Sequence, residues 1–189
     1  MIPIHRRTLL AAGATLPIGA ALRKPWAAGA GTWSGATLPD LSRPLAAPGE
    51  AVPDIHFTLA DGTPRTLADY AGQGVVLNFW ATWCLPCIAE MPALATLAAS
   101  VREAGVVVLP LSSDRGGAAA VERFYRDKNV QGLPVLLDPR GDAARAAGAR
   151  GIPTTLLIDS AGQERGRLEG ATDWGSDVSV AMVRLLAAG

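Results

Sequence analysis

Two cysteines that stand three positions apart are the residues of this chain best suited to chemistry. Cys84 and Cys87 lie in the segment 80–87, which reads WATWCLPC. The apolar run Val75 to Trp80 predicts a buried strand before them, and an apolar period of three and four residues predicts a helix after them. Unpaired N–H groups and the helix dipole stabilise a thiolate at a helix start, so we expect a lowered pKa and an attacking role for Cys84. Cys87 faces the same side of the helix and would resolve the mixed disulfide.

Other uses of a cysteine pair fit the sequence less well. A structural disulfide across so short a ring removes little loop entropy. Zinc requires two further ligands, and outside the first 30 residues the chain has one histidine, His56. Capture of Cu(I) by two thiolates stays open. Peroxidase chemistry needs a lone activated cysteine, whereas each thiol here has a neighbour that would trap it. We therefore predict no metal site and no cofactor beyond a redox-active Cys84–Cys87 disulfide.

The residues around the cysteines are candidates for contact with a substrate. Pro86 suits an early helical position and stiffens the turn. Trp83 and Leu85 flank Cys84; either could belong to the core, but at a strand–helix corner we favour a shallow apolar surface that docks protein substrates. Trp80 points the other way along its strand and is predicted to be a core residue.

Two motifs give the chain a family resemblance. The segment 79–87 (FWATWCLPC), followed by Glu90-Met91-Pro92, resembles the thioredoxin-like family, and within it the exported TlpA/ResA-type thiol–disulfide oxidoreductases. The segment 151–155 (GIPTT) matches the second signature of that family. The resemblance covers about residues 51–189. It implies an α/β thioredoxin fold, a central mixed sheet flanked by helices, with an added helix and strand at about Gly116 to Asp138. It also implies that the substrates are disulfides of other proteins.

The second signature supplies three further candidate residues, Ile152, Pro153 and Thr154. The resemblance implies a cis Pro153 beside the cysteines. A cis bond would leave the backbone of Ile152 free to pair with a substrate strand, and it would keep a third metal ligand away from the thiols. The simpler alternative is a proline at the start of an edge strand.

Glu90 is the candidate proton relay. The resemblance implies a buried aspartate under the resolving cysteine of ordinary thioredoxin, where this chain has Asn78, and an amide exchanges no proton near neutral pH. Glu90 follows Cys87 by three residues, on the neighbouring helical surface, and the group that the chain resembles has an acidic residue there. We predict that Glu90 carries the proton of Cys87. The alternative is an exposed glutamate that complements the helix dipole.

The remaining pattern predicts alternating strands and helices after an N-terminal hairpin at 54–66. Near-continuous apolar runs predict strands that are buried on both faces, at Val75 to Trp80, Val106 to Leu111, Val135 to Leu137 and Thr154 to Ile158. Glu164 to Leu168 predicts an edge hairpin strand. Helices are predicted from about Ile88 to a stop at Gly105, at Ala118 to Lys128, at Asp142 to Ala147 and at Asp173 to Ala188. In the last helix, one apolar stripe is predicted to contain Trp174, Val178, Ala181 and Leu185.

The front of the chain predicts export. Arg6 and Arg7 precede the short apolar run Leu9 to Leu22 and the small-residue site 28–30, which together resemble a twin-arginine signal. An uncleaved membrane anchor is the alternative. We divide the chain into an export signal at 1–30, a Pro/Gly/Ala-rich linker at 31–50 and a thioredoxin-like domain at 51–189, placed in the periplasm or at the extracytoplasmic face.

Composition narrows the class of protein. The 189 residues include 17 basic and 17 acidic side chains, and 49% are hydrophobic. This balance disfavours a protein that grips nucleic acid through its phosphates, and the apolar content excludes a disordered chain. Two cysteines exclude a scaffold of several disulfides.

The sequence therefore predicts an exported enzyme, a thiol–disulfide oxidoreductase that reduces protein disulfides and acts as a monomer. The resemblance suggests substrates in cytochrome c maturation or copper-delivery proteins of cytochrome oxidase, and a membrane thiol protein as the electron donor. The alternatives are a disulfide oxidase or isomerase of secreted proteins, which differs in reduction potential, and a copper-binding chaperone.

Overall fold

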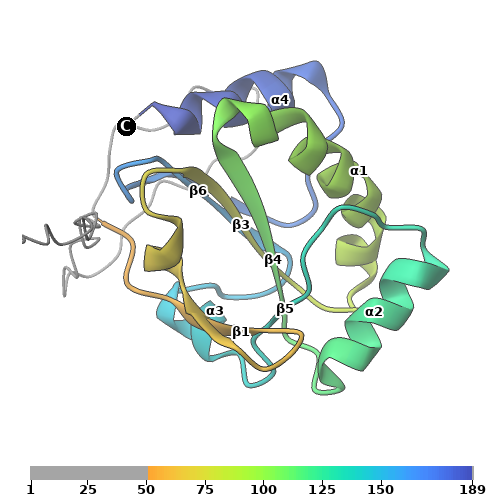
Figure 1. The fold of residues 1–189 in the computed structure, drawn as a ribbon. Coiled ribbons are helices and arrows are strands. Elements are labelled where there is room, and N and C mark those ends of the chain that lie inside the picture. Colours follow the sequence, from red (N-terminus) through yellow and green to blue (C-terminus); the bar gives the residue numbers. More distant parts are fainter. Residues whose placement is uncertain (1–50, 189) are drawn as a thin grey trace, which may run out of the picture.

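A computed structural model describes residues 51–188, and among these residues seven strands form one sheet. The strands are β1 (His56–Leu59), β2 (Pro64–Thr66), β3 (Gly74–Trp80), β4 (Val106–Ser112), β5 (Leu136–Leu137), β6 (Thr154–Ile158) and β7 (Glu164–Glu169). They lie in the order β2-β1-β5-β4-β3-β6-β7 (Figure 1). β3 is parallel to β4 and antiparallel to β6, so the sheet is mixed.

Helices cover both faces of this sheet. The α-helices of the described part of the chain are α1 (Leu85–Val101), α2 (Gly117–Asp127), α3 (Asp142–Ala146) and α4 (Asp177–Arg184). Short 3-10 turns occur at η1 (Leu67–Tyr70), η2 (Arg102–Ala104) and η3 (Leu185–Ala187). The buried side chains of α1, α2 and α4 pack into one core cluster, and those of α3 pack into a second cluster on the opposite face (Figure 1).

β3 lies in the interior of the sheet, between β4 and β6, and ends at the cysteine motif. All seven of its residues are buried, which explains why its sequence is almost continuously apolar. At its end the Trp80 ring is buried and stacks on Tyr125 of α2, with ring centroids 5.9 Å apart. The packing of α2 thus supports the strand end from which the cysteine loop begins.

The predicted fold class is confirmed. The hairpin predicted at 54–66 is the antiparallel pair β1–β2, and the added helix and strand are α2 and β5, with β5 parallel to β4. β6 has the predicted bounds, and Gly105 ends the α1–η2 segment with a left-handed φ of 79°. That conformation suits glycine, because it has no Cβ.

The prediction for the last helix was wrong in its start and in its buried face. α4 begins at Asp177, because the Ser176 hydroxyl caps it by accepting the Ser179 N–H, and Trp174 lies in the loop before it. Of the predicted stripe, Trp174 alone is buried; Val178 and Leu185 are 52% and 57% exposed, and Ala181 is also exposed. The residues that α4 and η3 bury instead are Ser179, Val183 and Leu186.

The predicted export signal at 1–30 and linker at 31–50 lie outside the described residues. The described part begins with an ordered contact, since Ala51 forms a bridge with Gln163 and Val52 is 1% exposed. Within residues 51–188, the helices are too short or too polar to cross a bilayer.

Candidate active site

The cysteine pair lies where β3 gives way to α1. Cys84 is the N-cap residue of α1, and Pro86 and Cys87 occupy its first turn. The two sulfurs form a disulfide with an S–S distance of 2.12 Å and a Cα–Cα distance of 5.3 Å. Cys84 is 6% exposed, whereas Cys87 has no exposed surface. Of the two cysteines, Cys84 is therefore the more accessible.

The start of the helix favours an ionised sulfur at Cys84. The backbone N–H of Cys87 donates to Cys84 Sγ over 3.3 Å. A free N–H group of the first helical turn and the positive end of the helix dipole both stabilise negative charge at this position. The geometry expected of an attacking thiolate is thus present.

The second signature lies against the same sulfur. The Ile152–Pro153 peptide bond is cis, as the resemblance implies. The Ile152 carbonyl oxygen lies 3.7 Å from Cys84 Sγ. Thr154 is 1% exposed and its hydroxyl donates to the Gly151 carbonyl, so a substrate would meet its backbone rather than its side chain.

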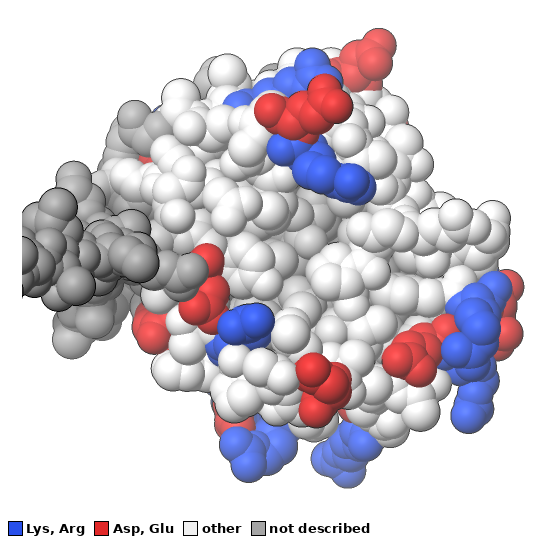
Figure 2. All heavy atoms as spheres, viewed as in Figure 1, with Lys and Arg blue, Asp and Glu red and all other residues white. Residues whose placement is uncertain are grey.

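The surface around Cys84 carries exposed apolar side chains. Trp83 is 67% exposed and Leu85 is 79% exposed, while Trp80 is fully buried. This distribution agrees with the predicted docking surface and with the predicted core role of Trp80. In Figure 2 the charged side chains lie mainly around the margin of the face shown, and its middle carries few.

Glu90 is buried rather than exposed, which excludes the alternative of a solvated glutamate at the helix start. It is 3% exposed, and its two carboxylate oxygens accept three hydrogen bonds. Oε1 accepts the amide of Asn78 at 3.0 Å, and Oε2 accepts the Thr172 N–H at 3.0 Å and the Trp174 indole N–H at 3.1 Å. Burial raises the pKa of Glu90, and these hydrogen bonds oppose the rise in part.

Asn78 lies beneath this carboxylate on β3. Its amide group also donates to the Thr155 hydroxyl over 2.8 Å. Among the described residues its side-chain oxygen meets no donor. Asn78 and Glu90 therefore form one buried polar pair, in which Glu90 is the group able to exchange a proton.

One protein-family model matches the chain over the part that contains the site. It describes the AhpC/TSA family and matches residues 48–165, more than half of the chain. The chain belongs to the AhpC/TSA family. The matched residues include the cysteine pair and the cis-proline segment, so family membership and site geometry concern the same part of the protein.

Individual members and solved structures resemble the chain over much of this domain. A protein of Bacillus thuringiensis named thiol-disulfide oxidoreductase ResA is 36% identical over 115 residues, which are 61% of this chain and 65% of that protein. The chain thus spans about 65% of the length of the curated relatives it matches.

Two solved structures extend the likeness to the fold. A putative thiol:disulfide interchange protein DsbE from Chlorobium tepidum has a TM-score of 0.65 and 27% identity, covering 76% of this chain and 99% of that one. An exposed lipoprotein thioredoxin from Streptococcus pneumoniae has a TM-score of 0.56 and 31% identity, covering 69% and 98%.

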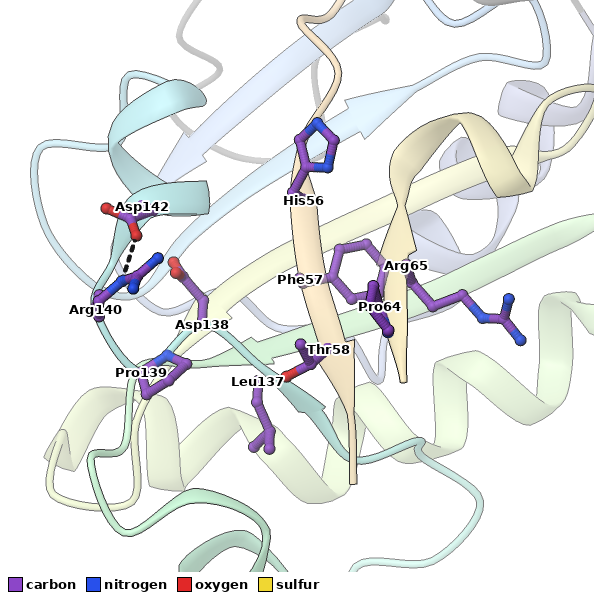
Figure 3. Close-up of a pocket in the computed structure, with 10 residues that line it drawn as sticks. All are labelled: His56, Phe57, Thr58, Pro64, Arg65, Leu137, Asp138, Pro139, Arg140 and Asp142. Atoms are coloured by element: carbon purple, nitrogen blue, oxygen red, sulfur yellow. Dashed lines mark hydrogen bonds and ion pairs between the residues drawn. The ribbon is translucent and has the colours of Figure 1, made fainter. Parts of the chain in front are cut away.

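The hollows that the described residues line include the following two. One of about 250 Å³ adjoins the cis-proline segment and is lined by Ile152, Pro153 and the ion-paired Arg150 and Glu169. The other, of about 420 Å³, lies between the β1–β2 hairpin and the start of α3 (Figure 3). In the sheet, β5 and β4 separate that hairpin from β3, so the larger hollow does not adjoin the cysteines. Within residues 51–188 no group of three potential metal ligands converges.

Several residues at the site escaped the sequence analysis. Thr172 and Trp174 hold Glu90, and Asp114, at the end of β4, accepts hydrogen bonds from the loop before Cys84. For Asp114 a signal existed, because an acidic residue two positions after a buried parallel strand lies near the edge where strand ends meet. Thr172 gave no comparable signal.

Proposed function

We propose that the chain is an exported thiol–disulfide oxidoreductase that reduces disulfides of protein substrates through Cys84 and Cys87. The observation that carries the proposal is the disulfide at the first turn of α1, with the more accessible sulfur beside the cis-proline segment. Relatives named thiol-disulfide oxidoreductase, at 35–36% identity, support it.

The proposed reaction has two exchange steps. The Cys84 thiolate attacks one sulfur of the substrate disulfide, whose S–S bond breaks, and the second substrate sulfur leaves as a thiol after taking up a proton. Cys87 then loses its proton and attacks Cys84 Sγ, which breaks the mixed disulfide and releases the first substrate sulfur. Two electrons pass to the substrate, and the Cys84–Cys87 disulfide remains.

Glu90 serves the second step in this proposal as the acceptor of the Cys87 proton. A buried carboxyl whose pKa is raised above its ordinary value accepts a proton more readily than an exposed carboxyl does. Its position three residues after Cys87 in α1 places it on the neighbouring helical surface.

The substrate in this proposal is an extended polypeptide. Its backbone pairs with Ile152 beside the disulfide, and its apolar side chains rest on Trp83 and Leu85. The exposure of both side chains supports this contact. Disulfides of cytochrome c maturation or copper-delivery proteins are the proposed targets, and a membrane thiol protein is the proposed electron donor.

Export to the periplasm or the extracytoplasmic face, with or without cleavage of the signal, completes the proposal. It rests on the twin-arginine-like sequence before residue 30 and is supported by the likeness to a structure described as an exposed lipoprotein thioredoxin. Fractionation of cells that carry the full chain, either as the wild type or with Arg6→Lys and Arg7→Lys together, tests export. Retention of both proteins in the cytosol would contradict it.

Catalysed reduction of insulin disulfides tests the activity. Reduced wild-type protein should reduce insulin, and the Cys84→Ser variant should not. Absence of reduction by the wild type would overturn the proposal. The direction of transfer follows from the reduction potential, since a value near about −120 mV is that of a strong oxidant and would favour the oxidase alternative.

A further inference from the structure

Asp114 is a buried carboxylate that holds the loop in front of Cys84. It is 4% exposed and lies just after β4. Its Oδ2 accepts the Thr82 backbone N–H at 2.8 Å and the Ser112 hydroxyl at 2.7 Å, and its Oδ1 accepts the Thr82 hydroxyl at 2.6 Å. Both the backbone and the side chain of Thr82 are therefore tied to this one carboxylate.

Thr82 belongs to the turn that ends at the nucleophile. The Cys84 N–H donates to the Ala81 carbonyl over 3.1 Å, so Thr82 lies within a turn that closes on Cys84. The Ser113 N–H donates to the Trp80 carbonyl at 2.9 Å and fixes the base of the same loop. The loop before Cys84 is thus held at Trp80 and at Thr82 by the segment that contains Asp114.

The charge of Asp114 has no cationic partner in the described part of the chain. The ion pairs found there do not include it, and three donors around an acceptor-only carboxylate fit the ionised form. The other ionisable side chains on the neighbouring segments are Glu90, buried on α1, Arg115, which is exposed to solvent, and two further buried groups. These are Asp138, whose backbone N–H donates to the Ser112 carbonyl, and Tyr125 of α2. Water screens a buried charge far less than an exposed one, so the field of Asp114 is screened less than that of Arg115.

We propose that the buried charge of Asp114 disfavours the Cys84 thiolate and so makes the reduced cysteine pair a stronger electron donor. Asp114 is a positioning residue that acts through Thr82 and through its field, without touching the sulfur. The inference rests on the proposed function and adds the feature that favours reduction of the substrate over its oxidation. The start of α1 stabilises the thiolate, and Asp114 opposes that effect.

The balance with glutathione measures this bias. Two glutathione thiols give two electrons and two protons to the Cys84–Cys87 disulfide, which becomes a dithiol while glutathione disulfide forms. Loss of a proton from Cys84 pulls this balance towards the dithiol. A charge that opposes ionisation therefore favours the disulfide and strengthens the dithiol as a reductant.

The variant Asp114→Asn separates the charge from the contacts. The amide oxygen can take the place of Oδ2 and accept from Thr82 N–H and Ser112, and the amide nitrogen can donate to the Thr82 hydroxyl, which also accepts. We expect alkylation rates against pH to give a Cys84 pKa lowered by roughly half a unit to one unit. Above the Cys84 pKa of the wild type, the equilibrium with glutathione should move about three- to tenfold towards the dithiol in the variant. Well below the Cys84 pKa of the variant, the two proteins should have the same equilibrium.

Two variants serve as controls. Asp127→Asn, an exposed carboxylate at the far end of α2, should leave both quantities unchanged. Asp114→Glu keeps the negative charge, so its Cys84 pKa should equal that of the wild type even where altered contacts lower the free energy of unfolding.

Two results with Asp114→Asn would overturn the inference, and a second measurement serves if this variant does not fold. A Cys84 pKa and glutathione balance equal to those of the wild type would overturn the inference, and so would a shift of the same size at every pH, since that is a structural effect. If Asp114→Asn does not fold, the carbon-13 NMR chemical shift of the Asp114 carboxyl is followed against pH in the reduced wild type. This chemical shift should change at the pKa of Cys84, and a constant value across that pKa would overturn the inference. Neither readout needs a protein substrate, so failure of insulin reduction would overturn the proposed function alone.

Discussion

At the scale of single residues, the site pairs two sulfurs of different accessibility with two buried carboxylates of different surroundings. Asp114 accepts hydrogen bonds from the loop before Cys84. Glu90, three residues after Cys87, accepts hydrogen bonds from Asn78, Thr172 and Trp174. Burial raises the pKa of Glu90. The two carboxylates are thus suited to different tasks: Asp114 holds the loop before Cys84, and Glu90 is the proposed proton acceptor.

The variant Glu90→Gln should slow the second exchange step near neutral pH. The glutamine oxygen can still accept from Thr172 and Trp174, and its amide can donate to the unpaired oxygen of Asn78 if that side chain turns, so the fold is retained. Loss of the proton acceptor should reduce the single-turnover rate about tenfold or more, and the gap should narrow as rising pH ionises Cys87 directly.

Stopped-flow release of the substrate thiol measures this rate. Glu103→Gln, an exposed glutamate at the other end of the same helical segment, provides the control and should behave as the wild type. Equal rates for Glu90→Gln and wild type between about pH 6 and pH 8 would exclude the relay.

At the scale of elements, the C-terminal segment packs closely against β3. Gly74 at the start of β3 lies against η3: a Cβ there would be 2.7 Å from both the carbonyl carbon and the Cβ of Leu186. Leu186 is itself fully buried. Because two of the opposing atoms belong to backbone, a change of side-chain rotamer cannot relieve the contact.

Gly74→Ala should therefore destabilise the domain by about 1–3 kcal/mol, the usual cost of overpacking. Urea unfolding measures the loss as a lower midpoint at an unchanged slope. Gly151→Ala is the matched control, since no atom lies within 4 Å of its added Cβ and its φ is not positive. A Gly74→Ala midpoint as high as that of Gly151→Ala would show that β3 and η3 pack less tightly than described.

At the scale of the whole molecule, one buried carboxyl links stability to pH. Glu164 on β7 is 2% exposed, and burial raises its pKa to about 7, although the neighbouring Arg167 guanidinium opposes the rise. In the unfolded chain its pKa returns to its ordinary value near 4.5. The folded state thus holds a proton that the unfolded state has released, and stability falls as the pH rises between these values.

Comparison with Glu164→Gln isolates this effect. The wild type should lose on the order of 3 kcal/mol more unfolding free energy than the variant between about pH 4.5 and pH 7, because glutamine has no proton to lose. Thermal or urea unfolding across this range measures the difference. Parallel stability profiles for the two proteins would contradict the assignment.

Much of the molecule follows from local patterns, because its strands are apolar and short motifs begin its main helix. The bounds of β6, the hairpin, and the placing of Cys84 and Cys87 at a strand–helix junction were predictable in this way. The contacts of Glu90 were not. They join α1 to β3 and to a loop more than eighty positions later, and only the order of the strands brings these segments together.

The last helix shows a second limit. An apolar period from Trp174 onwards looks helical, yet the indole is taken into the core by its bond to Glu90, and a serine cap starts the helix later. A tertiary contact displaced the helix start, and the buried stripe moved with it. Ser176 is a helix-start signal that the sequence contains, whereas the bond between Trp174 and Glu90 follows only from the tertiary fold.

The mixed disulfide formed by single-cysteine variants tests the central claim most directly. Reduced Cys87→Ala, mixed with insulin and examined by mass spectrometry, should form a covalent adduct through Cys84, because resolution is blocked. Reduced Cys84→Ala, whose remaining sulfur is fully buried, should form that adduct at least about a hundredfold more slowly. Equal adduct formation by the two variants, or none by Cys87→Ala, would contradict the assignment of Cys84 as the attacking sulfur.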